Sequence, residues 1–234
     1  MRWLSFLWVA LFSWFPWHHP AVSRPAPIIK QVLTTQKVVA LTFDDGPTRT
    51  WTPQILKILK DNHVRATFFV IGSHAIQRPD VLKEEVDAGM EIGSHGYQHL
   101  TLRQKDSQLV KREIAQNEEL FQSLGVPKPS LYRLPGGASD ATALKVLGEM
   151  GYKVIGWSVD TRDWRRRFSA SQLAERVMNQ VEPGAIVIFH DGPNSSMATV
   201  DAVKAIIPQL KKAGWKFDTV SELLKLERLP HHAS

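Results

Sequence analysis

The sequence predicts an α/β fold in which parallel strands form a distorted (β/α) barrel, with the active site on the face where the strands end. Two features of the chain lead to this fold class. Short apolar runs alternate with amphipathic runs over residues 36–226, which is typical of parallel strands covered by helices. Most of the apolar runs are also followed directly by Asp, His or Arg. In a barrel of parallel strands these positions share one face, on which barrel enzymes assemble active sites.

Seven short apolar runs have the length and composition of strands. They are residues 37–43, 66–71, 90–93, 130–134, 153–159, 185–189 and 215–217. Because helical segments separate most of them, we expect these strands to pair in parallel.

Six amphipathic segments between the strands are expected to form helices, because apolar residues recur in them every three or four positions. They are residues 52–61, 79–88, 106–124, 141–150, 171–181 and 199–212. Gly89, Gly125, Gly151 and Gly214 stand just beyond four of these segments, where glycine commonly ends a helix.

The first 23 residues are expected to be a signal peptide or a short membrane anchor. Met1 and Arg2 precede an uncharged apolar run over residues 3–17, as in export signals. As a helix this run would reach about 22 Å, which is short of the roughly 30 Å hydrocarbon core of a bilayer, so cleavage is favoured over anchoring. We therefore expect an exported protein, either extracellular, associated with the cell wall, or held by its N-terminus at the outer face of the cytoplasmic membrane.

The remainder of the chain has the composition of one globular domain. The 234 residues are 43% hydrophobic and 22% charged, enough for one full core. We expect a proline-rich linker over residues 24–35, the domain over residues 36–226 and a tail over residues 227–234, in a monomeric protein. The chain has no cysteine, which excludes thiol nucleophiles and cysteine metal sites. Its net charge of +6 suits an anionic neighbour such as a cell wall, but no nucleic-acid-binding pattern accompanies that charge.

The polar residues that follow the strands suggest a metal-assisted hydrolase. Asp44 and Asp45 follow the first strand, and His95 and His99 follow the third. These residues offer a metal ion one carboxylate and two imidazoles, with a second carboxylate left over as a base. The later strands end at Arg133, at Asp160 and Asp163, and at His190.

Five ordered motifs carry a resemblance to a known family. They are Thr42-Phe43-Asp44-Asp45-Gly46, His95-Gly96-Tyr97-Gln98-His99, Arg133-Leu134-Pro135-Gly136-Gly137, Asp160-Thr161-Arg162-Asp163-Trp164 and Ile188-Phe189-His190. With these motifs the chain resembles the polysaccharide deacetylases with the NodB-homology domain, carbohydrate esterase family 4, over residues 36–226. The resemblance implies a barrel of the NodB-homology type.

The resemblance also implies a role for each site residue. Asp45, His95 and His99 would bind a divalent ion, most simply Zn²⁺, with Co²⁺, Mn²⁺ or Ni²⁺ as alternatives. Asp44 would be the catalytic base and Arg133 its partner. The N–H of Gly136 would stabilise the oxyanion.

The same comparison implies that His190 donates a proton to the leaving amine while Asp163 holds its imidazole. Ile188 and Trp164 would shape the pocket for the acetyl methyl group, and Trp164 would also stack on a sugar ring. Simpler interpretations remain for two residues: Asp160 as a turn residue and Trp164 as a core residue. His63 and His74 match no motif. The run Arg165-Arg166-Arg167 is either a solvated loop or an attractor of an anionic polymer.

Three motifs depart from the family pattern, the mildest of them through Ile188 in place of Leu. Gly96 stands where Ser or Thr is usual, which removes a hydroxyl group expected to brace the metal-binding loop. Leu134-Pro135-Gly136-Gly137 replaces a Pro-Pro-aromatic stretch and so removes an aromatic wall.

The leading hypothesis is a metal-dependent N-deacetylase of a polysaccharide containing N-acetylglucosamine. Peptidoglycan is favoured over chitin because of the basic charge and the expected export. The alternatives are an O-acetyl esterase acting on xylan and a catalytically silent glycan-binding protein. In each case the expected partner is an acetylated polysaccharide.

Overall fold

The computed structural model describes residues 24–227. The expected signal peptide or anchor, residues 1–23, and nearly all of the expected tail lie outside these residues. One sheet contains every strand of the described chain. The strands are β1 Ile28–Ile29, β2 Val38–Asp44, β3 Thr67–Val70, β4 Glu91–Ser94, β5 Leu131–Tyr132, β6 Lys153–Ile155, β7 Val159–Asp160, β8 Ala185–His190 and β9 Lys216–Phe217.

Helices follow most of the strands. They are α1 Thr52–Asp61, α2 Gly72–Ala75, α3 Pro79–Asp87, α4 Ser107–Ser123, α5 Ala141–Glu149, α6 Ala170–Gln180, α7 Met197–Lys212 and α8 Val220–Leu224. Two short 3₁₀ helices, η1 Pro135–Gly137 and η2 Asp163–Arg165, follow β5 and β7. The six expected helices and their approximate bounds are confirmed, whereas α2, α8 and both 3₁₀ helices were not foreseen from the sequence. Among the described residues, no helix combines the length and apolar character needed to span a bilayer.

Side-chain caps explain where three of the helices begin. The Asp106 carboxylate accepts hydrogen bonds from the backbone N–H groups of Gln108 and Leu109 at the start of α4. Asp140 caps α5 in the same way, and Ser169 forms a capping box with Gln172 at the start of α6. These caps satisfy N–H groups that have no partner within the helix.

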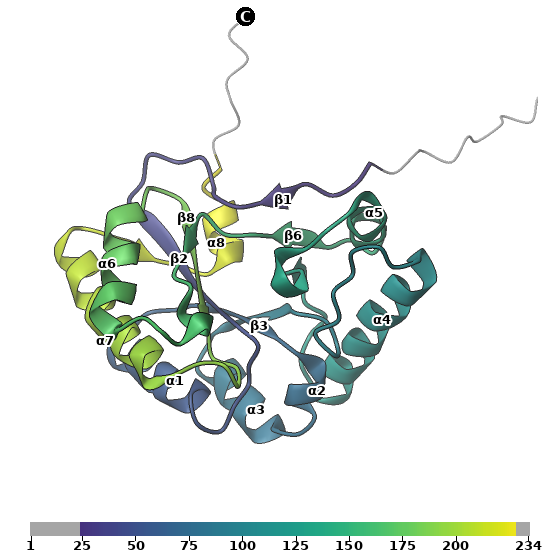
Figure 1. Cartoon of the computed structure of the whole chain (residues 1–234), viewed down its shortest axis with the longest axis horizontal. Helices are drawn as coiled ribbons and strands as arrows, with labels where there is room; N and C mark the ends of the chain where they lie inside the picture. Colours follow the sequence, from purple (N-terminus) through teal and green to yellow (C-terminus); the bar gives the residue numbers. More distant parts are fainter. Residues whose placement is uncertain (1–23, 228–234) are drawn as a thin grey trace, which may run out of the picture.

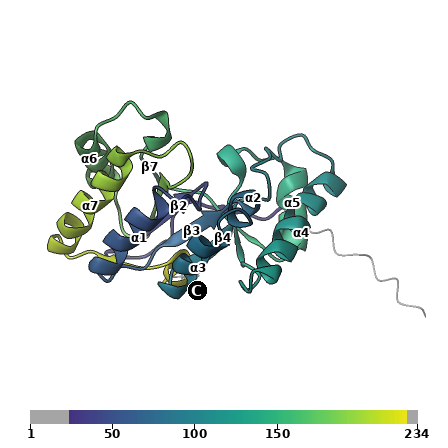
Figure 2. The same cartoon turned by 90° about the horizontal axis from the view of Figure 1, so that it is seen from below.

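The strands form a distorted barrel of parallel strands, as expected from the alternation in the sequence. Their order is β1-β6-β5-β4-β3-β2-β8-β7, with β9 beside β2, and all strand pairs are parallel. The helices lie around the sheet in an arc from α6 and α7 through α1 and α3 to α4 and α5 (Figure 1). Figure 2 shows β2, β3 and β4 in the middle of the molecule, between these two groups of helices.

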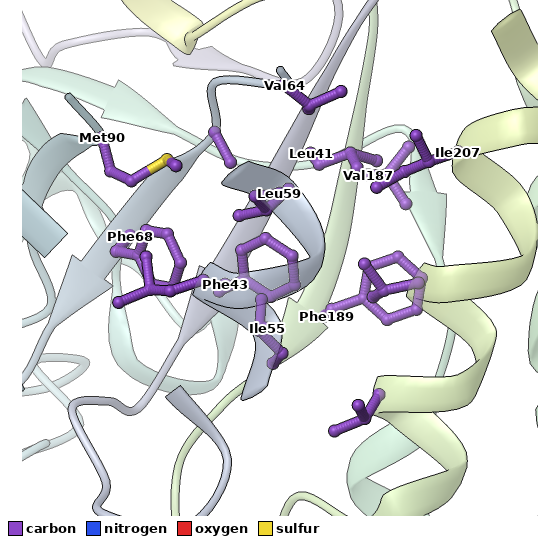
Figure 3. Packing of buried hydrophobic residues seen from close by; sticks show 14 of the residues in the cluster. Leu41, Phe43, Ile55, Leu59, Val64, Phe68, Met90, Val187, Phe189 and Ile207 are labelled. Atoms are coloured by element: carbon purple, nitrogen blue, oxygen red, sulfur yellow. The ribbon is translucent and has the colours of Figure 1, made fainter. Parts of the chain in front are cut away.

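Strand β2 shows how the alternation of side chains positions the site. Val39, Leu41 and Phe43 belong to the large core that includes residues of α1 and α7, and Figure 3 shows Phe43 between Phe68 and Phe189. The Phe43 ring centroid lies 4.9 Å from that of Phe68 and 6.0 Å from that of Phe189. Successive strand residues point to opposite faces, so the other set of β2 side chains, which ends with Asp44, points into the barrel.

The single strand expected over residues 153–159 is wrong. Instead, β6 pairs with β5 and β1, while β7 pairs with β8. Between them, Gly156 donates a backbone hydrogen bond to Ile29 (2.7 Å) and Ser158 donates one to Ile186 (3.0 Å). The chain thus changes partners within one apolar run, and residues 156–158 cross from β6, next to the β1 edge of the sheet, to β7 at its other edge.

The segment expected to be a linker, residues 24–35, is packed against the barrel in this structure. It contributes β1, which lies beside β6 on the side of the sheet opposite α3 (Figure 1). Val32 is buried, and its N–H donates a 3.0 Å hydrogen bond to the carbonyl of Gly184. The proline content therefore marks irregular backbone here, while the apolar residues of the segment add to the core.

Gly184 provides a test of that packing. It has a φ of +78°, and an added Cβ would lie 1.9 Å from the Val32 carbonyl oxygen. Gly214 is a matched control with a φ of +83° and open space around it. Positive φ should cost both Ala variants about 1–2 kcal/mol, while the clash should cost Gly184→Ala at least about 2 kcal/mol more. Urea unfolding measures both losses, and equal losses would contradict the packing of residues 24–35.

Candidate active site

The neighbouring residues Asp44 and Asp45 have different backbone conformations at the end of β2. Asp44 is the last residue of the strand and is buried. Asp45 has a φ of +74°, a left-handed conformation that Asp tolerates better than most residues. With this change of backbone direction both carboxylates reach the same cleft, where His95 Nε2 lies 3.8 Å from Asp44 Oδ2 and 3.3 Å from Asp45 Oδ1. His74 secures the turn, because its Nδ1 lies 2.7 Å from the carbonyl oxygen of Asp45 and must donate to it.

Asp45, His95 and His99 form a group of ligands suited to a cation. Their ligand atoms all lie within 4.8 Å of one another. The Oδ1 atom of Asp45 lies 3.3 Å from Nε2 of His95 and 3.3 Å from Nε2 of His99. This oxygen is buried and accepts no hydrogen bond from the described residues. One carboxylate and two imidazoles match the preferences of Zn²⁺ and similar divalent ions.

A hydrogen bond to the backbone prepares His95 for this role. Its Nδ1 lies 2.8 Å from the carbonyl oxygen of Arg133, so Nδ1 carries the proton. The Nε2 lone pair then points toward Asp45, as in histidine ligands whose second nitrogen donates to a carbonyl group.

The electrostatics of the three residues also favour a cation. Burial disfavours the charged form of His95, but the carboxylates of Asp44 and Asp45 raise its pKa above the ordinary value. For Asp45, burial opposes ionisation, yet the adjacent His95 ring holds its pKa below the ordinary value. Burial and the neighbouring His95 lower the pKa of His99. The two carboxylates therefore favour positive charge next to His95, whereas the lowered pKa keeps His99 in the neutral form that a metal ligand needs.

Asp44 pairs with Arg133, as expected from the resemblance. The Nη1 atom of Arg133 lies 2.7 Å from Asp44 Oδ1 and donates to it. Arg133 is completely buried, and its guanidinium also donates to the Thr42 hydroxyl and to the carbonyls of Ile155 and Gly156. The other Asp44 oxygen, Oδ2, lies 3.8 Å from His95 Nε2. Asp44 is therefore anchored through one oxygen, and the other faces the candidate metal site.

His190 and Asp163 form a second polar pair. The Nδ1 atom of His190 lies 2.8 Å from Asp163 Oδ1, and the backbone N–H of His190 donates to Asp163 Oδ2 at 2.9 Å. The Thr199 hydroxyl also donates to Oδ2 at 3.1 Å. Burial alone would lower the pKa of His190, but the hydrogen bond and charge of Asp163 outweigh it and raise the pKa to about 9. The imidazole is therefore protonated at neutral pH, as a proton donor requires.

One cleft of about 430 Å³ brings most of these residues together. Every site residue expected from the sequence lines it, except the buried Arg133 and Asp163, which lie behind Asp44 and His190. The lining residues are Asp44, Asp45, His95, His99, Gly136, Gly137, Trp157, Asp160, Trp164, Ile188, His190 and Asn194. Trp164 is 46% exposed, so the core role considered for it is wrong. Asp160 lines the cleft and also caps its own turn by accepting from the N–H of Arg162.

Sequence reasoning missed Trp157, Asn194, His74, Asp191 and Glu113. Trp157 was hidden inside the strand assumed over residues 153–159, and Asn194 belongs to no recognised motif. His74 is far from the motifs in sequence, and only the folded chain brings its ring to Asp45.

Asp191 braces the turn that carries Asp45. Its carboxylate is buried, accepts a hydrogen bond from the Thr52 hydroxyl and packs against Gly46, where an added Cβ would lie 2.2 Å from Oδ2. Burial raises the pKa of Asp191 to about 7. The only signal in the sequence was its position directly after His190.

Glu113 braces the loop that carries His95 and His99. Its Oε1 atom accepts hydrogen bonds from the N–H groups of Tyr97 and Gln98 at 2.9 and 2.7 Å. Gly96 in this loop has a φ of +79°, which glycine adopts readily. The loop is thus held by a carboxylate from α4, although the hydroxyl group usual at position 96 is absent.

Comparison with known proteins finds that the chain is similar to polysaccharide deacetylases. The sequence profile of the polysaccharide deacetylase family matches residues 31–155. A peptidoglycan-N-acetylglucosamine deacetylase of Bacillus cereus is 37% identical over 197 residues, covering 83% of this chain and 92% of the relative. The PgdA deacetylase of Listeria monocytogenes is 38% identical over 190 residues, and the match spans 81% of this chain but only 39% of PgdA. A chitooligosaccharide deacetylase of Sinorhizobium fredii is 33% identical over 76% of this chain and 87% of its own length.

Solved structures have the same fold. The structure of a peptidoglycan N-acetylglucosamine deacetylase superposes with a TM-score of 0.82 at 33% identity, over 87% of this chain and 96% of that chain. A CE4 family pseudoenzyme from Bacillus anthracis superposes with a TM-score of 0.80 at 29% identity, over 87% of this chain and 71% of that chain. The fold thus occurs in active and in inactive proteins, and the side chains of the site must decide between them.

Removal of one expected ligand should abolish tight metal binding. We expect His99→Ala to lower the affinity for Zn²⁺ by more than about 100-fold, and His74→Ala, which affects the Asp45 backbone only, by about 10-fold. Affinity should fall as pH falls, because protons compete for the imidazoles. Calorimetric titration measures these affinities. His63→Asn is the control, since Asn tolerates the positive φ of that position. Parent-like binding by His99→Ala would contradict the assignment.

Asp163→Asn should lower the pKa of His190 from about 9 toward its unperturbed value of about 6.5. Because the pKa of His190 is higher in the folded than in the unfolded protein, protonation of His190 stabilises the fold. This stabilisation is complete at pH values below the unfolded-state pKa and is lost as the pH rises through about 9. The stability difference between parent and variant should therefore be largest below about pH 6.5 and shrink toward pH 9.

NMR titration of the His190 ring and urea unfolding across this pH range measure both effects. Asp160→Asn is the control, because Asp160 lies on the same loop and has no hydrogen bond to His190. If both variants leave the pKa of His190 at its parent value, Asp163 does not set it.

Proposed function

Because this chain belongs to the polysaccharide deacetylase family, whose members are hydrolases, we propose that it removes N-acetyl groups from N-acetylglucosamine residues of an exported polysaccharide, with peptidoglycan as the favoured substrate. One observation carries the proposal. The Asp44–Arg133 pair, the group of Asp45, His95 and His99, and the His190–Asp163 pair all meet at a single cleft.

Asp44 is positioned to act as the catalytic base. Its Oδ1 atom is held by Arg133, so Oδ2 is left to accept the proton of an attacking water molecule. A divalent ion held by Asp45, His95 and His99, with Zn²⁺ as the simplest choice, would supply positive charge that promotes ionisation of water and polarises the acetyl carbonyl. Because Arg133 compensates the charge of Asp44, the base keeps its orientation as it gains the proton.

Gly136 is positioned to stabilise the oxyanion. The turn over residues 134–138 is closed by hydrogen bonds from Gly137 to Leu134 and from Ala138 to Pro135, and the N–H of Gly136 takes part in neither. Gly136 also lines the cleft with a φ of +63°. A backbone N–H group held in this way can donate to the oxygen on which negative charge develops.

His190 is positioned to protonate the leaving amine. Its Nδ1 is engaged by Asp163, so its Nε2 is the nitrogen left to face the cleft. The raised pKa of His190, about 9, keeps a proton on the ring at neutral pH. An amine is a poor leaving group unless it is protonated as the C–N bond breaks, so this step matters most for an amide substrate.

The substrate assignment rests on the cleft wall and the character of the chain. Ile188 and Trp164 provide apolar surface beside the site, suited to an acetyl methyl group and to the face of a sugar ring. The net charge of +6 and the export signal expected over residues 1–23 favour an anionic wall polymer over neutral chitin. The relatives reported above include peptidoglycan deacetylases and a chitooligosaccharide deacetylase, so chitin oligomers are the second choice. We also propose that the protein acts outside the cytoplasm.

The metal-loaded protein should release acetate from defined peptidoglycan and chitin oligomers, and mass spectrometry of the products locates each lost acetyl group. Asp44→Asn should abolish release. Because this variant leaves the Arg133 cation buried without its anion, at a cost of about 3–5 kcal/mol, circular dichroism must show that it folds. His190→Gln is the second variant and should slow amide hydrolysis by about 10²–10⁴-fold.

The same assay separates the two alternatives. Turnover of acetylated xylan without turnover of any N-acetyl substrate would identify an O-acetyl esterase. Binding of glycans without turnover, across the divalent metals Zn²⁺, Co²⁺, Mn²⁺ and Ni²⁺, would identify a silent glycan-binding protein. The intact base and acid pairs argue against the silent alternative.

A further inference from the structure

Four arginines follow β7 and form a basic loop at the edge of the cleft. The arginine loop comprises Arg162, Arg165, Arg166 and Arg167, all exposed. Trp164, between the first two, lines the cleft. The Arg165 guanidinium lies 5.0 Å from the centroid of the Trp164 ring. Positive charge is thus placed directly on the aromatic side chain that forms part of the cleft wall.

Most of this charge has no anionic partner within the described chain. Arg162 forms a long contact with Asp160 (3.8 Å). Arg165, Arg166 and Arg167 form no ion pair with any described carboxylate; Arg165 and Arg167 instead contact the rings of Trp164 and Phe168. The nearby Asp163 carboxylate is buried and bound to His190. Three guanidinium groups on the loop that carries Trp164 therefore have no described carboxylate as a partner and are available to an external anion.

The loop is held in place by the catalytic machinery. Asp163 lies inside it and accepts hydrogen bonds from His190 and Thr199. The N–H of Arg166 donates to the carbonyl of Asp163 at 2.9 Å. Arg162 and Arg166 both have positive φ, 59° and 52°, which is uncommon for arginine. The backbone of the loop is therefore a defined turn fastened to His190 through Asp163, and its arginines project from that turn.

Resting on the proposed function, we infer that the arginine loop binds carboxylates carried by the substrate, so that the cleft selects glycan strands with acidic substituents over neutral ones. Guanidinium groups bind carboxylates through paired N–H donors. Peptidoglycan carries carboxylates on its lactyl groups and peptide stems, whereas chitin carries none. A sugar stacked on Trp164 would bring the substituents of its own strand next to Arg165.

The test compares three substrates: peptidoglycan oligomers with free carboxylates, the same oligomers with those carboxylates amidated, and chitin oligomers of equal sugar number. The variant is Arg165→Gln, Arg166→Gln and Arg167→Gln combined. The matched control is Lys60→Gln, Lys204→Gln and Lys212→Gln combined, which removes the same charge from exposed positions on α1 and α7. Lys60 and Lys212 lie at or near the carboxyl ends of their helices, at the opposite end of the barrel from the cleft.

The loop variant should raise KM for the free-carboxylate oligomers about five- to tenfold, the sum of several weak surface pairs, while kcat stays within about twofold. Its KM for amidated oligomers and for chitin should stay within about twofold, and the preference of the parent for free carboxylates should disappear. Added salt should weaken binding of the free-carboxylate oligomers by the parent more than by the variant. The lysine control should behave as the parent does.

An equal rise in KM on all three substrates, or no rise on any, would overturn the inference while leaving the deacetylase assignment intact. If the parent releases acetate from none of them, the proposed function fails. In that case the affinities of the free-carboxylate and amidated oligomers, measured by calorimetry, test the role of the arginine loop separately. A preference for free carboxylates that is lost in the loop variant supports the inference, and equal binding of both oligomers refutes it.

Discussion

The buried guanidinium of Arg133 is the interaction on which the rest of the site depends. It donates to Asp44 and Thr42 at the end of β2 and to the carbonyls of Ile155 and Gly156, where the chain leaves β6. Its planar group lies 4.0 Å from the ring centroid of Phe69. Removing either partner of a buried ion pair leaves an unpaired charge in a medium of low dielectric constant, which costs several kcal/mol. This cost holds Asp44, the proposed base, and the break between β6 and β7 in one arrangement.

Arg133 also links Asp44, the proposed base, to His95, one of the candidate metal ligands. The carbonyl of Arg133 accepts the proton of His95 Nδ1, and this leaves Nε2 as a ligand. The side chain of Arg133 therefore orients Asp44, while its backbone sets the tautomer of His95. His190 has its own support, because Asp163 is fully engaged by His190 and Thr199. The result is an aspartate paired with a buried cation and a histidine paired with a buried carboxylate, and both pairs meet at one cleft.

Close backbone contacts complete the arrangement. An added Cβ at Gly46 would lie 2.2 Å from the Asp191 carboxylate, and one at Gly192 would lie 2.2 Å from the Cβ of Asp45. The loops after β2 and β8 can therefore touch only because both positions are glycine. Their contact places Asp45 and His190 beside the same cleft, although 145 positions separate them in the sequence. The arginine loop extends this rigid assembly to the rim, where a polymer would approach.

The sequence by itself determined the class of fold, the approximate positions of the six long helices and the five polar motifs, because periodic apolar residues and glycine at helix ends are local signals. It also identified Asp44, Asp45, His95, His99, Arg133, Asp163 and His190 as the central residues, since each follows a strand in a parallel fold. It failed for residues 24–35 and 153–159, and it missed Asp191 and Glu113. Only the tertiary structure decided these features. The apolar run over residues 153–159 shows no break in composition, and the break arises because β6 and β7 have different neighbours. A buried carboxylate that braces a loop likewise depends on which N–H or hydroxyl groups distant segments bring to it.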